Sequence, residues 1–248
     1  MRRRKVMLWV LGFVGLGLVL PLGVRYMSYS WAKVPWYQTE SGPTDLAPDP
    51  ATTPEAVVQV YGAPTYGWRG VFAVHTWIVM KPENAPRYAR REVVGWGGGS
   101  VIKYDRGGPD DRWAGKAPSL LVEHRGDAAA ALIPQIEAAV QSYPYPDRYQ
   151  AFPGPNSNTF LAHIARSVPG LGLDLPPSAI GKDFRPLTAP VGAAPSGRGL
   201  QVNILGLGGM ILSPEEGIEI NMLGFGVGVD VLDPALRLPG FGRVPNSS

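Results

Sequence analysis

Three polar residues at separate points of the chain have the types that nucleophilic catalysis requires. Ser157 lies in PGPNSNTF (153–160), where a Pro- and Gly-rich loop leads into a predicted helix. A hydroxyl at a helix N-terminus lies near unpaired backbone N–H groups, which can stabilise an oxyanion. His75, in the predicted strand 70–80, is the candidate base, and Glu92 is the candidate group that orients its imidazole. The same patterns occur without catalysis, because Ser and Asn cap helices and buried histidines form hydrogen bonds in protein cores.

Three neighbouring residues are candidates for ligand binding. Asn156 and Asn158 flank Ser157, and the position of the loop predicts Ser157 or Asn158 as the N-cap. Period-two alternation places Trp77 on the same strand face as His75. We therefore take Asn156, Asn158 and Trp77 as the candidate binding residues.

The elements expected around these residues are short strands and two helices. One helix is predicted over 128–142 with Asp127 as its N-cap, and Pro134 inside it implies a kink or a restart. The second helix is predicted over 159–168, followed by an ordered irregular segment, 169–198. Runs rich in β-branched and aromatic residues predict strands at 56–61, 70–80, 92–96, 101–104 and 119–124. This pattern predicts an α+β fold with an antiparallel sheet and two main helices.

The C-terminal part contains an internal repeat. VNILGLG (202–208) recurs as INMLGFG (220–226), with a turn signal at 213–217 between the copies. The pair predicts a Gly-rich β-hairpin over 199–232, in which alternation would place the glycines of each copy on one face. A face without side chains permits close packing against the domain itself, or forms a flat groove for an acyl chain.

An apolar run near the N-terminus predicts membrane attachment. Residues 6–24 contain no charge and would span about 28 Å as a helix, which is enough for a bilayer core. Residues 2–5 are all basic, so the positive-inside rule leaves residues 1–5 in the cytoplasm and exports the rest. This predicts a single-pass membrane protein with its domain on the periplasmic or extracytoplasmic side. A cleaved signal peptide is the alternative, although no clear cleavage site follows residue 24.

Composition excludes several classes of protein. The 248 residues suit a single exported domain, 55–248, after a juxtamembrane aromatic segment and Pro-rich linker over 25–54. Residues 2–5 hold four of the 23 basic residues, and the other 19 nearly balance the 20 acidic ones, so nucleic-acid binding is not indicated. The chain has no cysteine and only three histidines, and the acidic loop 105–111 matches no calcium motif. We expect no metal site and no cofactor.

Several stretches together resemble a bacterial family known as domain of unknown function 3750. They are AVVQVYGAPTYGWRG (56–70), FAVHTWI (72–78), PGPNSNTFLAHIAR (153–166), LDLPPSAIGKDF (173–184) and the closing Gly-rich repeat. The resemblance implies a membrane-associated bacterial protein and assigns no activity.

A more remote similarity concerns the active-site arrangement. The His strand followed by the helix start is similar to circularly permuted papain-like proteins, the NlpC-type peptidases and lecithin:retinol acyltransferase-like proteins. His75 matches their strand His, and Ser157 falls where they carry a cysteine. The similarity implies a permuted papain-like fold after one N-terminal transmembrane helix. A serine hydroxyl does not ionise as a thiol does, so the departure weakens the catalytic implication.

Two functions follow from these observations. The first is a non-catalytic envelope module that binds a lipid or another envelope component. The second is a serine-dependent hydrolase or acyltransferase that acts on peptide, amide or acyl bonds, with Ser157 as nucleophile, His75 as base and Glu92 as orienting group.

Overall fold

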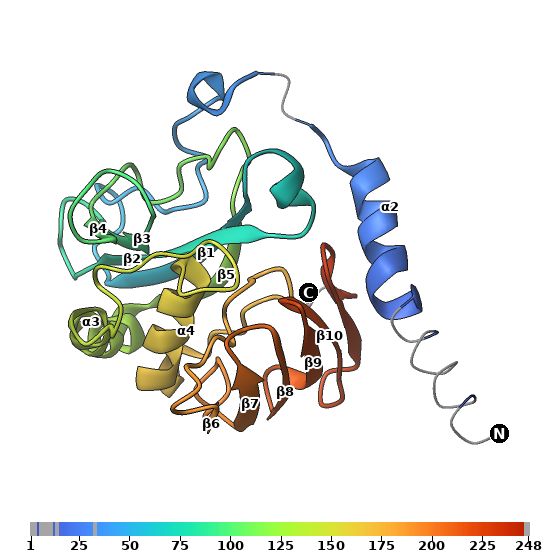
Figure 1. Ribbon diagram of the computed structural model, residues 1–248. Helices are drawn as coiled ribbons and strands as arrows, with labels where there is room; N and C mark the ends of the chain where they lie inside the picture. Colours follow the sequence, from blue (N-terminus) through green and yellow to red (C-terminus); the bar gives the residue numbers. More distant parts are fainter. Residues whose placement is uncertain (1–3, 5–11, 13–14, 32–33, 246–248) are drawn as a thin grey trace.

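The computed structural model describes residues 4, 12, 15–31 and 34–245, which form two antiparallel sheets and three α-helices (Figure 1). The first sheet has the strand order β4-β3-β2-β1-β5. Its strands are β1 (Val57–Pro64), β2 (Val74–Lys81), β3 (Ala89–Val93), β4 (Ile102–Tyr104) and β5 (Ser119–Arg125). The predicted α+β class and antiparallel pairing are confirmed, although the β2 strand begins at Val74 because Gly67–Val71 forms a 3-10 turn.

Two helices cover one face of this sheet and form the main core with it. They are α3 (Gly126–Gln141) and α4 (Ser157–Ser167). The α3 helix follows Arg125 rather than Asp127 and continues through Pro134 without a break. Irregular residues after α4 also enter this core, including Leu171, Leu173 and Leu175. The opposite face of the sheet carries a smaller aromatic cluster around Tyr61, Trp77, Val79, Tyr88 and Trp113.

The second sheet has seven strands that follow one another in chain order, from β6 to β12. They are β6 (Val191–Gly192), β7 (Leu200–Ile204), β8 (Gly208–Ser213), β9 (Gly217–Met222), β10 (Phe225–Asp230), β11 (Ala235–Leu238) and β12 (Gly242–Val244). The sequence predicted only one hairpin here. Glycines at positive φ, such as Gly206, Gly224 and Gly240, lie in several of the short connections and allow the strand that follows to return beside the previous one.

The internal repeat differs from its predicted arrangement, because each copy contains a turn. Leu205 and Gly206 in the first copy, and Leu223 and Gly224 in the second, all have positive φ. The copies therefore form the β7–β8 and β9–β10 hairpins, joined by the β8–β9 turn. A continuous strand face of glycines does not exist, so a lipid groove cannot rest on one.

Both repeat copies use their asparagine in the same way. Asn203 Oδ1 accepts from Gly206 N (2.5 Å), and Asn221 Oδ1 accepts from Gly224 N (3.1 Å). Both Nδ2 atoms donate to the same oxygen of Asp183, at 2.7 and 2.6 Å. The two hairpins are thus fixed to one carboxylate of the preceding loop.

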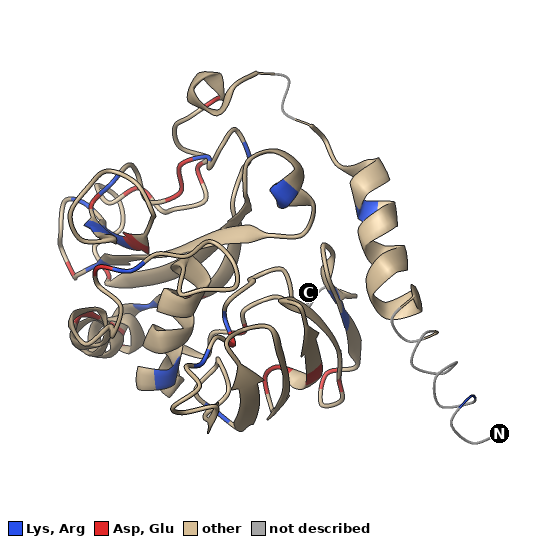
Figure 2. Cartoon of the chain, viewed as in Figure 1, with Lys and Arg blue, Asp and Glu red and all other residues tan. Residues whose placement is uncertain are grey.

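The N-terminal helix lies beside the second sheet (Figure 1). It consists of a π-helical turn η1 (Gly15–Val19) and α2 (Leu20–Ser28). Arg25 is the only charged residue of α2, which is otherwise tan in Figure 2. In the part of the chain that the structure describes, no helix is long and apolar enough to cross a membrane. Residues 6–11 and 13–14 of the predicted anchor lie outside that part.

The Pro-rich segment 38–54, expected as an extended linker, is bound to the domain. Asp110 is buried, and its Oδ2 accepts hydrogen bonds from the backbone N of Thr44 (3.2 Å), Leu46 (2.7 Å) and Ala47 (3.3 Å). Tyr88 donates to the carbonyl of Pro48 at 3.0 Å. Asp110, from the acidic loop 105–111, therefore organises this segment.

Candidate functional site

The structure brings His75 and Glu92 together on adjacent strands. His75 lies near the start of β2 and Glu92 near the end of β3, and the two strands pair directly. His75 Nε2 lies 2.8 Å from Glu92 Oε2, and Arg90 Nη2 donates to the same oxygen at 3.0 Å. Both partners of the histidine–glutamate pair are buried, with 4% and 1% of their surface exposed. This is the orientation that the sequence predicted for Glu92, whereas a catalytic role stays a prediction.

Aromatic rings enclose the His75 imidazole. The Trp113 ring stacks on it with centroids 3.7 Å apart, and Trp77 stacks at 5.8 Å. The Arg90 guanidinium lies 4.3 Å from the Trp77 ring centroid, a cation–π distance. Sequence reasoning missed Trp113 and Arg90. Arg90 shares its strand face with Glu92 by alternation, but Trp113 comes from a loop whose path no local pattern indicates.

Burial and charge together set the protonation of the pair. Burial lowers the pKa of His75, and Glu92 opposes this effect only in part. For Glu92, burial acts to raise the pKa, but the hydrogen bond from His75 and the hydrogen bond and charge of Arg90 lower it overall. Glu92 is therefore ionised and His75 neutral at pH 7. Because a carboxylate only accepts, His75 Nε2 carries the proton and Nδ1 keeps its lone pair.

Two atoms of this cluster are sealed from solvent without a hydrogen-bond partner. They are Glu92 Oε1 and Arg90 Nε. His75 Nδ1 also makes no hydrogen bond to a described residue, and its side chain is 4% exposed. Nδ1 is therefore the basic nitrogen of the cluster, and it is enclosed together with the ring.

The start of α4 is capped by Asn156 and not by Ser157 or Asn158. Asn156 Oδ1 accepts from the backbone N of Asn158 (2.9 Å) and Thr159 (3.2 Å), and Thr159 Oγ1 accepts from Asn156 N (3.1 Å), completing a capping box. Ser157 is the first helical residue.

The candidate binding residues are engaged within the fold. Asn156 Nδ2 donates to the carbonyls of Ala151 (3.1 Å) and Ile180 (3.0 Å). Asn158 Nδ2 donates to Ile180 O at 2.8 Å, and its Oδ1 accepts from Thr76 Oγ1 at 2.9 Å. Trp77 is fully buried, and its Nε1 donates to Pro109 O at 2.7 Å. None of these groups is open to a ligand in this conformation.

The structure does not join Ser157 to His75. Thr76, the next residue along β2, points to α4 because its hydroxyl donates to Asn158. Consecutive side chains of a strand point to opposite faces, so His75 projects from the face away from α4. The Ser157 hydroxyl makes no hydrogen bond to His75 or to any other described residue, and Ser157 is 3% exposed.

A hollow of about 760 Å³ lies behind the His75 cluster, against the N-terminal segment 43–50. Its wall includes Gly108 and Pro109, whose carbonyls accept from Arg90 and Trp77. Neither Ser157, His75 nor Glu92 lines it. Among the residues that the structure describes, no group of three His, Cys, Asp or Glu side chains is placed to hold a metal ion.

Residues 55–184 match a protein family described as Protein of unknown function (DUF3750). The chain belongs to this family. The matching region runs from the start of the first sheet to one residue beyond Asp183, so it contains His75, Glu92 and Ser157 but not the second sheet. No curated protein and no solved structure shows significant similarity to the chain.

Proposed function

We propose that this protein is a non-catalytic binding module of the bacterial envelope, attached to the membrane through residues 6–24 with residues 1–5 in the cytoplasm. The observation that supports the absence of catalysis is the separation of base and nucleophile. His75 is held by Glu92 on the sheet face away from α4, whereas Ser157 is the first residue of α4. A serine hydroxyl without a base at hydrogen-bond distance is a weak nucleophile. The ligand is a lipid or another envelope component.

We also propose that the first sheet and α4 form a permuted papain-like scaffold. The α4 helix packs on β2, the strand that carries the histidine, and the histidine precedes the helix in the chain. Glu92, on the neighbouring strand, occupies the position of a third group that orients the imidazole. The scaffold thus keeps the residue types of the base and its orienting group on the histidine strand and its neighbour, on the sheet face away from α4, while the nucleophile position carries serine.

A serine-reactive fluorophosphonate probe tests the proposal on the full chain in phospholipid vesicles. We expect no labelling that depends on Ser157, because the hydroxyl is buried and has no base. Ser157→Ala and His75→Asn are the matched variants, and an active serine hydrolase in the same vesicles shows that the probe is reactive. Labelling that disappears in both variants would overturn the proposal.

A hydrolase or acyltransferase that uses Ser157 is the second candidate function. The observation that favours it is the His75–Glu92 pair, in which Nδ1 makes no hydrogen bond to a described residue; the pair is the base and orienting group that such an enzyme needs. It requires a conformation in which the imidazole reaches the α4 side of the sheet. Probe labelling that is lost in both variants would favour it.

A further inference from the structure

In the second sheet the usual placing of side chains is reversed, because apolar side chains lie on its outer, solvent-facing side. Outward-pointing residues that pair across neighbouring strands form rows that run across the sheet. One row is Leu200, Leu212, Ile218, Val229, Leu236 and Val244, and these side chains are 41–50% exposed. The next row begins with Val202, Met210 and Ile220, which are 41–44% exposed. Outward positions of the described strands β7–β12 are all apolar residues or glycine, as the pairing and burial patterns show.

The inner face of the same sheet carries the charges. Arg237 is fully buried, and it donates to Glu219 (3.0 Å), to Asp174 (2.5 and 2.7 Å) and to Leu175 O (3.0 Å). Lys182 Nζ also donates to Glu219, at 2.9 Å. Antiparallel sheets at a protein surface normally place apolar residues inward and polar residues outward. The buried ion pairs fix the opposite orientation, so the apolar face cannot turn inward without breaking them.

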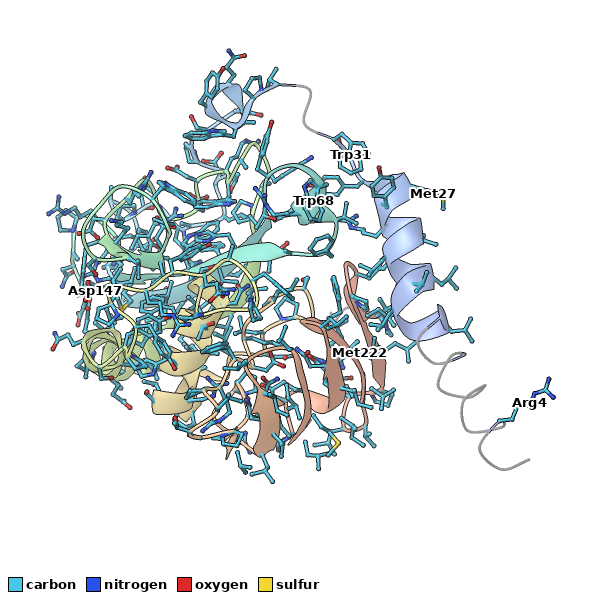
Figure 3. All side chains as sticks on the ribbon, viewed as in Figure 1. Arg4, Met27, Trp31, Trp68, Asp147 and Met222 are labelled. Carbon is cyan, nitrogen blue, oxygen red and sulfur yellow. The ribbon has the colours of Figure 1, made fainter. Side chains whose placement is uncertain are left out.

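The N-terminal helix lies on this apolar face. A Cβ at Gly17 of η1 would lie 3.2 Å from Val227 Cγ1, which shows close packing of the helix on β10. Val227 belongs to the row of Ile220 and is 7% exposed because the helix covers it. The helix has its own exposed apolar side chains, including Leu16 (70%) and Met27 (79%). Figure 3 shows Met27 pointing away from the body of the protein.

We infer that the outer face of the seven-stranded sheet, together with the exposed side of helix 15–28, lies against the acyl-chain layer of a lipid bilayer. The reason for choosing a bilayer is that the apolar segment predicted to enter the membrane is continuous with this face, because its helix packs on β10. Contiguous apolar surface of this kind marks an interaction site. Interfaces with soluble partners contain a substantial polar share, whereas hydrocarbon accepts a surface without hydrogen-bonding side chains. The inference rests on the membrane attachment in the proposed function and adds a second contact to it.

Site-specific fluorescence tests the inference on the full chain in vesicles of phosphatidylethanolamine and phosphatidylglycerol. The chain has no cysteine, so Ile218→Cys and Asp147→Cys each provide a single site for an environment-sensitive label. Ile218 is on the apolar face, and Asp147 is exposed and lies at the left edge of Figure 3, opposite the N-terminal helix. We expect lipids with nitroxide-labelled acyl chains to remove most of the fluorescence at position 218 and none at position 147.

Each other outcome overturns the inference in a recognisable way. If the protein floats with the vesicles but neither label is quenched, the N-terminal segment alone attaches it and the proposed function stands. If the label at position 218 is protected from aqueous iodide yet not quenched by the lipids, another copy of the chain covers the face. If the protein does not float with the vesicles, the membrane attachment in the proposed function fails as well.

Discussion

The protonation of Asp183 should make the stability of the protein depend on pH, and this dependence reports on the contact between Asp183 and the second sheet. Asp183 is 2% exposed, and its Oδ2 accepts from the amides of Asn203 and Asn221. Burial raises its pKa from 3.8 to about 6, while the positive charge of Lys182 opposes the rise. The folded protein therefore holds a proton on this group more tightly than the unfolded chain does.

This difference in pKa predicts the size and sign of a pH effect on stability. The shift is about 2 pKa units, and each unit corresponds to about 1.4 kcal/mol, so the effect is about 3 kcal/mol. The stabilisation by the protonated acid is fully present below the unfolded pKa of 3.8. It is lost as the pH rises through about 6, because the ionised carboxylate is then buried.

Asp183→Asn isolates the effect. An asparagine oxygen in the place of Oδ2 accepts from both amides and carries no charge at any pH. We expect the free energy of unfolding of the wild-type protein, minus that of the variant, to fall by about 2 kcal/mol between pH 4 and pH 7, since part of the full change occurs below pH 4. Urea denaturation of the full chain in mild detergent, followed by tryptophan fluorescence, measures it. Asp147→Asn, which removes an exposed carboxylate, is the matched control. Parallel pH profiles for wild type and Asp183→Asn would refute the reasoning.

Two further substitutions test the buried charges. Glu92→Gln should lower the pKa of His75 further, because Glu92 now raises it against the effect of burial; an NMR titration of the His75 ring that does not move would contradict the pairing. Arg237→Met leaves Glu219 with Lys182 alone and Asp174 without its partner, and should destabilise the fold by about 3 kcal/mol in urea denaturation. A loss under about 1 kcal/mol would show that the Arg237 ion pairs do not hold the inner face.

Local signals predicted the first sheet well. Alternating β-branched and aromatic residues identified β1 and β2, and the Pro/Gly loop before Ser157 identified the start of α4. Alternation also placed His75 and Trp77 on one face. It did not show which face α4 covers, because that depends on how distant segments pack. This is why the sequence suggested a Ser157–His75 pair that the structure does not join.

The second sheet was harder to predict for two physical reasons. Leu205 and Leu223 adopt positive φ, which bulky residues rarely do, so VNILGLG has no evident turn at its centre. Alternation of Ile218, Glu219 and Ile220 shows that the two isoleucines share a face. It does not state which face is buried, and the usual rule of apolar residues inside gives the opposite of the observed orientation.

The shared hydrogen bonds at Asp183 define where this protein can be divided. The family match ends at residue 184, whereas Asn203 and Asn221 in the two repeat hairpins both donate to Asp183. Lys182 and Asp174, inside the matched region, likewise bind Glu219 and Arg237 beyond it. A fragment that stops at residue 184 would keep the acids and the lysine but lose the groups that neutralise them. The region recognised as the family is therefore narrower than the unit joined by these buried bonds, and we expect a fragment that stops at residue 184 to be less stable than the full chain.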